Sequence, residues 1–359
     1  MTTDTKPAMP TRLKLDPATV LTNSRIQAYA SCPRRHYLRY ELGISPQVDA
    51  RVLRFGTCVH KALDNVRRGM DEGMALEDAI SYFITEDFAD HEQVRALVEG
   101  YWRRWRPESW TVIQSEMIFE VPIINPASGA AARIFTLAGK SDVIVKLDDG
   151  RTAVVEHKTT CDDLAPDSDY WKRLRIDSQI SLYVLGAWQL GYRVDTVVYD
   201  VLHRPLLEPL AVPLTDADGV KIVLGPEGWR VRTKDGKKWR ETSDSAQGYV
   251  LQTRPMTAAE YKARLEGDIA QRPEYYYARR EIARLPADLE EARMDLYHMA
   301  KLIRESQLNR YWPRNTSACR GFGRCPFFEL CTGGYDVNSG EVPEGYELVK
   351  DLHPELMGE

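Results

Sequence analysis

The segment from residue 111 to residue 159 constrains the fold most, because its apolar residues recur with a period of two. Three stretches share this pattern: "TVIQSEMIFEVPI" (111–123), "ARIFTLAGKSDVIVKL" (132–147) and "TAVVEHKT" (152–159). Such alternation is typical of β-strands, and "DDG" at 148–150 is typical of a tight turn. We therefore expect a three-strand antiparallel meander in the middle of the chain.

Helical patterns flank this meander. Ser24 is a candidate N-cap for a helix that Pro33 must interrupt or restart, and helical spacing continues to about residue 105. A helix is expected over 170–190, with Gly191 as its C-cap, followed by the strand "VDTVVYDVLH" (194–203). This order of elements predicts an α/β fold in which helices flank a mixed sheet.

Composition along the chain indicates six segments. We expect a flexible N-terminal arm (1–22), an N-terminal helical region (23–108), the core (109–204), an insertion or flap rich in Pro, Gly, Asp and Lys (205–250), a C-terminal helical region with a cysteine-bearing loop (251–335), and a loosely attached tail (336–359). The C-terminal region includes a long amphipathic pattern, "DLEEARMDLYHMAKLIRESQ".

Charge argues weakly against a general polyanion binder, because the net charge is −5. Basic runs nevertheless occur at 34–39, 103–106, 172–175 and 232–240, and each is as consistent with a solvated face as with a local basic groove. No apolar run is long enough for a bilayer, and the N-terminus lacks the apolar core of a secretion signal. We expect a cytoplasmic protein, encoded by a prokaryote or a phage, with reduced cysteines.

Two charges end the last strand of the meander. Glu156 and Lys158 are two residues apart, so their side chains share one face of the strand while His157 points away. The tight turn pairs this strand with the one before it and brings Asp142 near Glu156. Two carboxylates beside a lysine can hold a hard divalent cation. An isolated E-x-K, however, is more often a surface ion pair.

The neighbouring motifs change that balance. "GKSD", which ends in Asp142, together with "EHK" resembles the core of the PD-(D/E)xK nucleases. "GTCVH", which ends in His60, and "QISLY", with Gln179 and Tyr183 at i and i+4, resemble two further motifs of the RecB-like family. That family includes the AddB-type and CRISPR-adaptation nucleases.

The resemblance implies an activity and a set of residue roles. It implies a DNA exonuclease of recombination or repair that acts with Mg²⁺ or Mn²⁺ on single strands or duplex ends. The implied metal ligands are His60, Asp142, Glu156 and the backbone carbonyl of His157. Lys158 would orient the attacking water, and Gln179 and Tyr183 would line the site and contact the strand.

The DNA path and the partners follow from the same resemblance. Tyr29, Arg34 and Arg35 are candidates for the path of the strand, because aromatic rings and guanidinium groups suit single-stranded DNA. The chain has no helicase P-loop, so any unwinding motor or recombination protein would be a separate chain. No membrane partner is expected.

Three cysteines lie within thirteen residues, Cys319, Cys325 and Cys331, and Cys32 is a distant fourth candidate. Four thiolates suit zinc, although structural zinc sites favour tighter cysteine pairs than this C-x5-C-x5-C spacing. The pattern also resembles the iron–sulfur members of the RecB-like family, in which one early and three late cysteines hold a [4Fe–4S] cluster. The first gap is three residues longer here than in the common family spacing. Cys58 and Cys161 match no motif and are interpreted as structural.

Two alternative functions remain open at this point. One is a non-catalytic iron–sulfur protein that binds nucleic acid, although such a protein should have lost the acidic pair or the lysine. The other is an endonuclease of the same fold in which zinc replaces the cluster.

Overall fold

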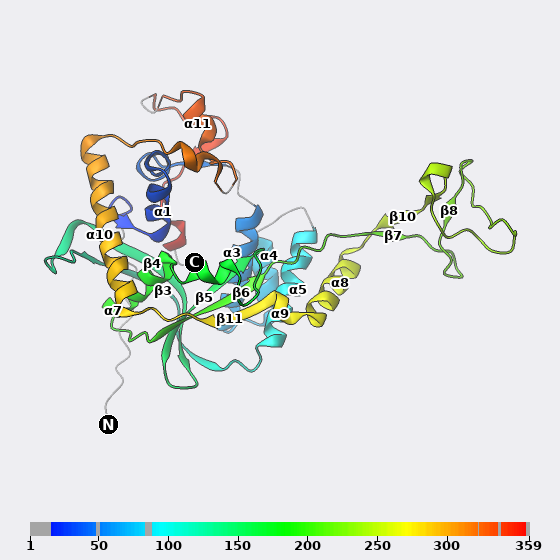
Figure 1. Cartoon of the computed structure of the whole chain (residues 1–359), viewed down its shortest axis with the longest axis horizontal. Coiled ribbons are helices and arrows are strands. Elements are labelled where there is room, and N and C mark those ends of the chain that lie inside the picture. Colours follow the sequence, from blue (N-terminus) through cyan, green and yellow to red (C-terminus); the bar gives the residue numbers. More distant parts are fainter. Residues whose placement is uncertain (1–15, 48–50, 83–87, 322, 337–338, 357–359) are drawn as a thin grey trace.

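A mixed β-sheet forms the centre of the computed structural model, which describes residues 16–47, 51–82, 88–321, 323–336 and 339–356. Within these residues the sheet has the order β1–β4–β5–β6–β11, and β3 also pairs with β4. The strands are β1 (Val20–Leu21), β3 (Trp110–Ile124), β4 (Ala131–Leu147), β5 (Thr152–Thr160), β6 (Thr196–His203) and β11 (Tyr277–Glu281). Helices lie on both sides of the sheet (Figure 1), as expected for an α/β fold.

The meander has the expected antiparallel pairing. β4 pairs with both β3 and β5, and the β4–β5 turn contains Gly150, whose φ of 86° needs glycine's freedom. β5 then pairs in parallel with β6, with His157 opposite Asp200. Because β5 and β6 are parallel, their carboxyl ends lie at the same edge of the sheet. That edge carries Glu156 and Lys158.

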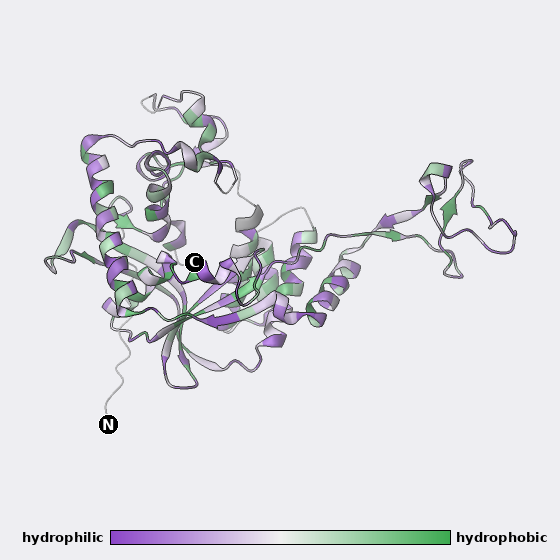
Figure 2. Ribbon diagram, viewed as in Figure 1, coloured by the Kyte–Doolittle hydropathy of each residue, from purple (hydrophilic) through white to green (hydrophobic). Residues whose placement is uncertain are grey.

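The two faces of the sheet have different helices. One face packs against α1 (Asn23–Ser31), α7 (Ser178–Gln189) and α10 (Pro286–Asn309) around core residues such as Ile144 and Val154. The other side carries α3 (Arg51–Arg67), α4 (Glu72–Tyr82), α5 (Phe88–Arg104), α8 (Ala258–Gln271) and α9 (Pro273–Tyr276). Hydrophobic and hydrophilic residues are interspersed along the helices of the core (Figure 2), and the buried apolar ones form two clusters, one on each side of the sheet.

Two expected helices differ from the structure. The helix over 170–190 is split into α6 (Asp169–Leu174) and α7, because Asp177 caps α7 by accepting a hydrogen bond from the Gln179 amide at 2.9 Å. At the N-terminus Thr22, and not Ser24, caps α1, with its hydroxyl accepting from the Arg25 amide at 3.3 Å. Pro33 starts α2 (Pro33–His36), which continues into a π-helical turn, Tyr37–Glu41.

The residues expected as an insertion form an arm that extends away from the sheet (Figure 1). We use "arm" for residues 208–256. Its stem is the antiparallel pair β7 (Ala211–Pro213) and β10 (Thr253–Pro255), and its outer part contains β8 (Val223–Leu224), β9 (Val250–Leu251) and a short 3₁₀ helix, Ser245–Gln247.

Both ends of the chain are part of the fold where they are described. The N-terminal segment 1–22 was expected to be flexible. Its residues up to 15 lie outside the described residues, but Val20 and Leu21 form a fully buried strand. The expected loose tail is packed: β12 (Tyr346–Leu348) pairs with β2 (Ile44–Pro46), and His353 and Leu356 are buried. The remaining short elements are 3₁₀ helices Thr316–Arg320 and Pro354–Leu356, and α11 (Phe328–Thr332).

Across the described ranges, no helix combines the length and the apolar character needed to cross a bilayer.

Candidate active site

A chain of hydrogen bonds joins the end of β5 to α7. The Lys158 ammonium donates to Glu156 Oε1 at 2.9 Å and to Gln179 Oε1 at 2.7 Å. Gln179 Nε2 then donates to the hydroxyl of Tyr183 at 2.9 Å. Lysine and carboxylate share a face because β5 alternates, and Gln179 and Tyr183 share a face because they are one helical turn apart. The four residues predicted from the two motifs therefore form one connected group.

Asp142 and His60 form a second group beside the first. Asp142 Oδ2 accepts a hydrogen bond from the His157 backbone amide at 2.8 Å, as the hairpin register requires. His60 lies on α3, and its Nδ1 is 3.5 Å from Asp142 Oδ1. The register of the meander and the direction of α3 thus bring Asp142, His60 and the β5 end to one edge of the sheet.

Two glycines of the motifs allow this close packing. A Cβ on Gly56 would lie 2.9 Å from Thr159 Oγ1, so only glycine lets α3 approach β5 one turn before His60. A Cβ on Gly139 would lie 2.7 Å from Phe119 and 2.9 Å from the ring of Tyr183. The two glycines therefore allow α3 to approach β5, and Phe119 and Tyr183 to pack against β4.

Burial shapes the charges at this edge. Glu156 is only 3% exposed, and burial raises its pKa to about 7, with the nearby Asp142 charge acting in the same direction. Its Oε2 atom is buried without a hydrogen-bond partner among the described residues. Burial opposes the charge on Lys158, but Glu156 outweighs it and raises the pKa of the ammonium. The group thus presents an unpaired carboxylate oxygen at a site that disfavours negative charge.

His60 and Asp142 each stabilise the charged form of the other. Burial alone would lower the pKa of His60, but the carboxylate of Asp142 raises it. Conversely, burial would raise the pKa of Asp142, but His60 and the His157 amide lower it. In the absence of a cation, the pair behaves as an ion pair.

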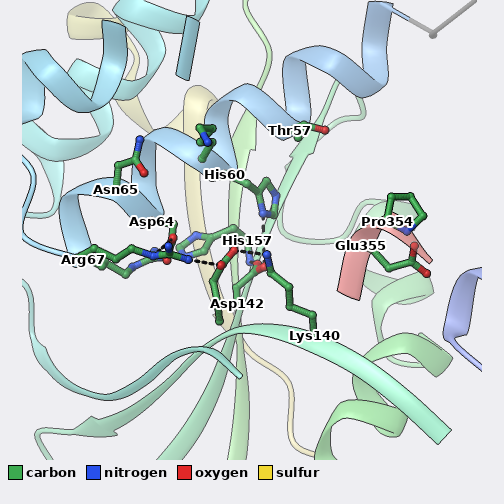
Figure 3. Close-up of a pocket in the computed structure, with 13 residues that line it drawn as sticks. Thr57, His60, Asp64, Asn65, Arg67, Lys140, Asp142, His157, Pro354 and Glu355 are labelled. Atoms are coloured by element: carbon green, nitrogen blue, oxygen red, sulfur yellow. Dashed lines mark hydrogen bonds and ion pairs between the residues drawn. The ribbon is translucent and has the colours of Figure 1, made fainter. Parts of the chain in front are cut away.

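An open cleft of about 490 Å³ leads to this group (Figure 3). His60, Asp142 and His157 line it together with Arg67, Arg68 and Lys140. Pro354 and Glu355 of the C-terminal 3₁₀ helix form the opposite wall (Figure 3). Glu156, Lys158, Gln179 and Tyr183 are not among the residues that line the cleft.

The cations of the cleft are held by acids. Arg68 contacts Asp64 at 2.6 Å and also pairs with Glu116, which binds Lys140 as well. Glu116 has a left-handed backbone (φ 44°), which is uncommon for a residue other than glycine. Asp64 and Arg67 lie four and seven residues after His60, so helical spacing from the histidine could have predicted them. Glu116 and Glu355 carried no such signal.

The side chain of His157 points to the opposite side of the sheet from Glu156. Its Nδ1 is 3.4 Å from Asp200 Oδ2, and its Nε2 contacts Arg67. Asp200 also accepts from the Tyr101 hydroxyl at 2.6 Å and pairs with Arg279 at 3.0 Å. Burial keeps the pKa of His157 well below its usual value, so the imidazole is neutral and the contact with Asp200 is polar rather than ionic.

Sequence reasoning missed this buried network. Its one signal was an aspartate inside the apolar run "TVVYDVLH", where an unpaired charge would be costly.

The three residues proposed for the strand path lie elsewhere. Tyr29 is buried, and its hydroxyl contacts Ser306 Oγ at 2.7 Å and the Leu302 carbonyl at 3.0 Å on α10. Its ring therefore packs between helices and does not offer a face to a base, which corrects the expectation. Arg34 lies over the ring of Tyr37, and Arg35 lines a different cavity.

That cavity, of about 420 Å³, is lined by all four candidate cysteines: Cys32, Cys319, Cys325 and Cys331. Backbone contacts bring the two chain ends to it, since the Arg34 amide donates to the Pro313 carbonyl at 3.1 Å and Asn315 Nδ2 donates to the Ser31 carbonyl at 2.8 Å. Burial raises the pKa of the Cys331 thiol. Cys58 is buried and Cys161 is exposed, and neither lines this cavity.

The donors present suit the groups that a nuclease of this kind would hold. In the part of the chain that the structure describes, no three His, Cys, Asp or Glu side chains already converge as a site for one metal ion. Carboxylates, an imidazole and a backbone carbonyl are nevertheless donors that divalent cations use, and the unpartnered Glu156 Oε2 leaves one of them available. At the cavity, four thiols surround a space lined by Phe327 and Phe328.

Comparison with known proteins places the chain in a family. No curated protein matches the sequence. One solved structure, provisionally named an exonuclease and from Eubacterium rectale, aligns over 89% of this chain and 90% of its own, with 9% identity and a TM-score of 0.42. Another, SSO0001, aligns over 72% and 78%, with 13% identity and a TM-score of 0.24. Both scores are too low to carry an argument.

A family model, by contrast, matches residues 20–332, which include every motif residue discussed above. The chain therefore belongs to the PD-(D/E)XK nuclease superfamily.

Proposed function

We propose that this nuclease is a Mg²⁺- or Mn²⁺-dependent DNA exonuclease of the RecB-like type that carries a structural [4Fe–4S] cluster. The observation that carries the proposal is the convergence at one sheet edge of Asp142, His60 and the hydrogen-bonded group of Glu156 and Lys158. The alternative of a non-catalytic binding protein is disfavoured, because the two acids, the lysine and the histidine are all present.

The residues of this edge have separate roles in the proposed reaction. His60, Asp142, Glu156 and the His157 carbonyl would hold the cation, which when bound supplies Lewis acidity and lowers the pKa of water. Lys158 orients the attacking water, and Gln179 keeps the ammonium in place through its 2.7 Å hydrogen bond. Tyr183 fixes Gln179 in turn. Asp200 and Arg67 hold the His157 side chain and so fix the backbone on which the carbonyl lies.

Features of the cleft support a strand end as the substrate. Arg67 adds positive charge to the cleft beside Asp142, which suits a phosphate that flanks the scissile bond, whereas Arg68 and Lys140 are paired with Asp64 and Glu116. The C-terminal wall of Pro354 and Glu355 narrows the cleft on the side that faces them. Such a cleft favours a single strand or an end over a continuous duplex. A separate helicase or recombination protein would then supply unwound DNA.

The cysteine cavity supports the cluster. Four cysteines from both ends of the chain line one cavity, and four thiolates are the ligand set of a [4Fe–4S] cluster, although they also suit zinc. The apolar rings of Phe327 and Phe328 beside them would limit solvent access. Iron, zinc and acid-labile sulfide contents of protein purified without oxygen distinguish the cluster from zinc.

The test of the activity uses end-labelled linear DNA and circular single-stranded DNA with Mg²⁺ or Mn²⁺. We expect linear single strands and duplex ends to be degraded from their termini, the circle to stay intact, and Glu156→Ala to remove the activity. Cleavage of the circle would contradict the exonuclease assignment. Wild-type activity in Glu156→Ala protein would contradict the site.

A further inference from the structure

The strongest charged feature outside the site is the outer part of the arm. Six of the twelve residues from 229 to 240 are Arg or Lys and one is acidic, although the whole chain has a net charge of −5. We use "tip" for residues 225–241. Neither the cleft nor the cysteine cavity includes any of them. A concentrated positive charge on an acidic protein needs a separate explanation.

Aromatic rings hold the guanidinium groups of the tip. Arg230 and Arg232 each lie 4.5 Å from the ring centre of Trp239, and Arg240 lies 3.8 Å from that of Tyr249. The isolated bridge between Arg232 and Trp239 fixes this arrangement, and the turn that connects them uses Gly236 with a φ of 70°. The cations are thus presented on a structured loop.

The acids of the tip region do not neutralise its lysines. Asp235 accepts hydrogen bonds from the Thr233 hydroxyl at 2.5 Å and the Lys237 amide at 3.2 Å, which lowers the pKa of its carboxyl. Lys234, Lys237 and Lys238 are exposed, and none of the three forms an ion pair with a described residue. Their charge is therefore available to a polyanion.

The arm leaves the sheet at the catalytic edge. It follows β6, which is parallel to β5 and ends at His203 opposite Thr160, two residues beyond Lys158. At its root, Arg204 donates from its backbone to the Thr160 carbonyl at 2.8 Å and pairs with Asp90 of α5 at 3.0 Å. On its return it enters α8, whose fully buried Tyr261 contacts the Leu207 carbonyl.

Both strands of the arm are therefore anchored to the nuclease core (Figure 1). The arm projects from the side of the core that carries α5 and α8 (Figure 1). From this placement and charge we propose that the tip binds the phosphate backbone of DNA at a distance from the scissile bond and so holds long substrates. The inference rests on the proposed function for its substrate, but its ligand, a nucleic-acid phosphate chain, is defined by the tip itself.

The test measures DNA binding without a divalent cation, so that no cleavage occurs. The variant is Lys234→Ala/Lys237→Ala/Lys238→Ala. The control variant is Lys146→Ala/Arg193→Ala/Arg293→Ala, which also removes three positive charges. Lys146 and Arg193 adjoin the starts of β5 and β6, at the edge of the sheet opposite to Glu156. The dissociation constant is measured by fluorescence anisotropy at several salt concentrations. The labelled long probes are single-stranded and duplex DNA of about 40 nucleotides, and the short probe is an oligonucleotide of about 6 nucleotides, the size of one small binding site.

We expect the tip variant to bind long DNA at least about tenfold more weakly, with the slope of log K against log salt reduced by about 3, one unit for each phosphate that the tip no longer neutralises. Binding of the short oligonucleotide, and its cleavage once Mg²⁺ is added, should match the wild type. The control should keep the wild-type slope.

Equal affinities and slopes for the tip variant and the control would overturn the inference and would assign the tip to another partner, such as an acidic protein. This outcome is independent of the nuclease assignment, because binding is measured without turnover. Conversely, a wild-type protein that binds long DNA through the tip but does not cleave it would contradict the proposed function alone.

Discussion

The catalytic edge and the cysteine cavity are built in opposite ways. At the catalytic edge, the side chains satisfy one another: Lys158 bonds to Glu156 and Gln179, and Asp142 to the His157 amide. At the cavity, four cysteines line a space, and the chain ends around it are joined by protein contacts: β12 pairs with β2, Tyr37 stacks on Trp312 at 4.2 Å, and Leu38 and Ile44 pack with Phe327 and Leu330. The first site lies on regular strands and helices, whereas the second lies on short elements and loops from the two ends of the chain.

This difference predicts separable phenotypes. Changes at the catalytic edge should remove activity with little effect on stability, because strands and helices position those residues. Changes at the cavity should remove stability first, because a bound group joins segments that are distant in the sequence.

The largest effect is expected from neutralising the buried pair at the catalytic edge. In Glu156→Gln/Lys158→Met no unpaired charge remains, and replacing a buried ion pair with neutral groups of similar size is often neutral for stability. We expect cleavage to fall by a factor of about 100 to 10,000 or more, with the free energy of unfolding within about 1 kcal/mol of the wild type.

Cleavage assays and urea denaturation check this prediction. Lys172→Ala is a suitable control, because Lys172 is exposed on α6 and its ion pair among the described residues is with the exposed Asp169. A double variant that loses several kcal/mol of stability would show that the pair holds the fold together, and the contrast between the two sites would fail.

The cavity should respond in the opposite way. In Cys32→Ser we expect loss of iron and of visible absorption, and a decrease in stability of about 4 kcal/mol if the group is normally bound at a thousand times its dissociation constant. Protease sensitivity should rise on the loop around Cys319 and Cys325, although these residues lie far from the carboxylates. Activity per folded molecule on a short oligonucleotide should change little.

Cys161→Ser is the control, because Cys161 is exposed and does not line the cavity. If Cys32→Ser protein keeps its iron content and its protease resistance, Cys32 is not a ligand, and the two chain ends are joined by protein contacts alone.

The two sites also differ in how far the sequence predicted them. For Asp142, Glu156 and Lys158, alternation and one tight turn predicted the relative positions, because strand register places side chains once the pairing is known. Their interpretation as a site still needed the motif resemblance. The gathering of Cys32 with the late cysteines followed only from a family resemblance, because no local rule relates residues at opposite ends of a chain.

Other parts of the site had no local signal at all. Glu355 reaches the cleft from a segment expected to be a loose tail, and the Asp200 network joins β6, α5 and β11 through tertiary packing. Tyr29 was misassigned for the same reason: a tyrosine on an amphipathic helix suits both packing and stacking on a base, and only the position of α10 decides between them.

The smallest predicted effect is on the pH dependence of stability and concerns His36, on the N-terminal side of the cavity. It tests whether a residue other than the cysteines helps to stabilise this region. His36 is fully buried four residues after Cys32, and its Nε2 accepts a hydrogen bond from Arg25 Nε at 3.2 Å. Burial and the Arg25 charge lower its pKa to about 3. Between this value and the ordinary pKa of about 6.5, the unfolded chain binds a proton that the folded chain does not.

Stability should therefore be unaffected by His36 above pH 6.5 and should fall as the pH decreases towards 3. At pH 5 the loss is about 2 kcal/mol relative to pH 7, from 1.4 kcal/mol per pH unit. His36→Gln, whose amide oxygen can still accept from Arg25, should remove this part of the pH dependence in urea denaturation curves, whereas His298→Gln on the exposed face of α10 should not. An unchanged pH dependence in His36→Gln would mean that His36 binds protons equally in the folded and unfolded chain, and that burial does not hold it neutral.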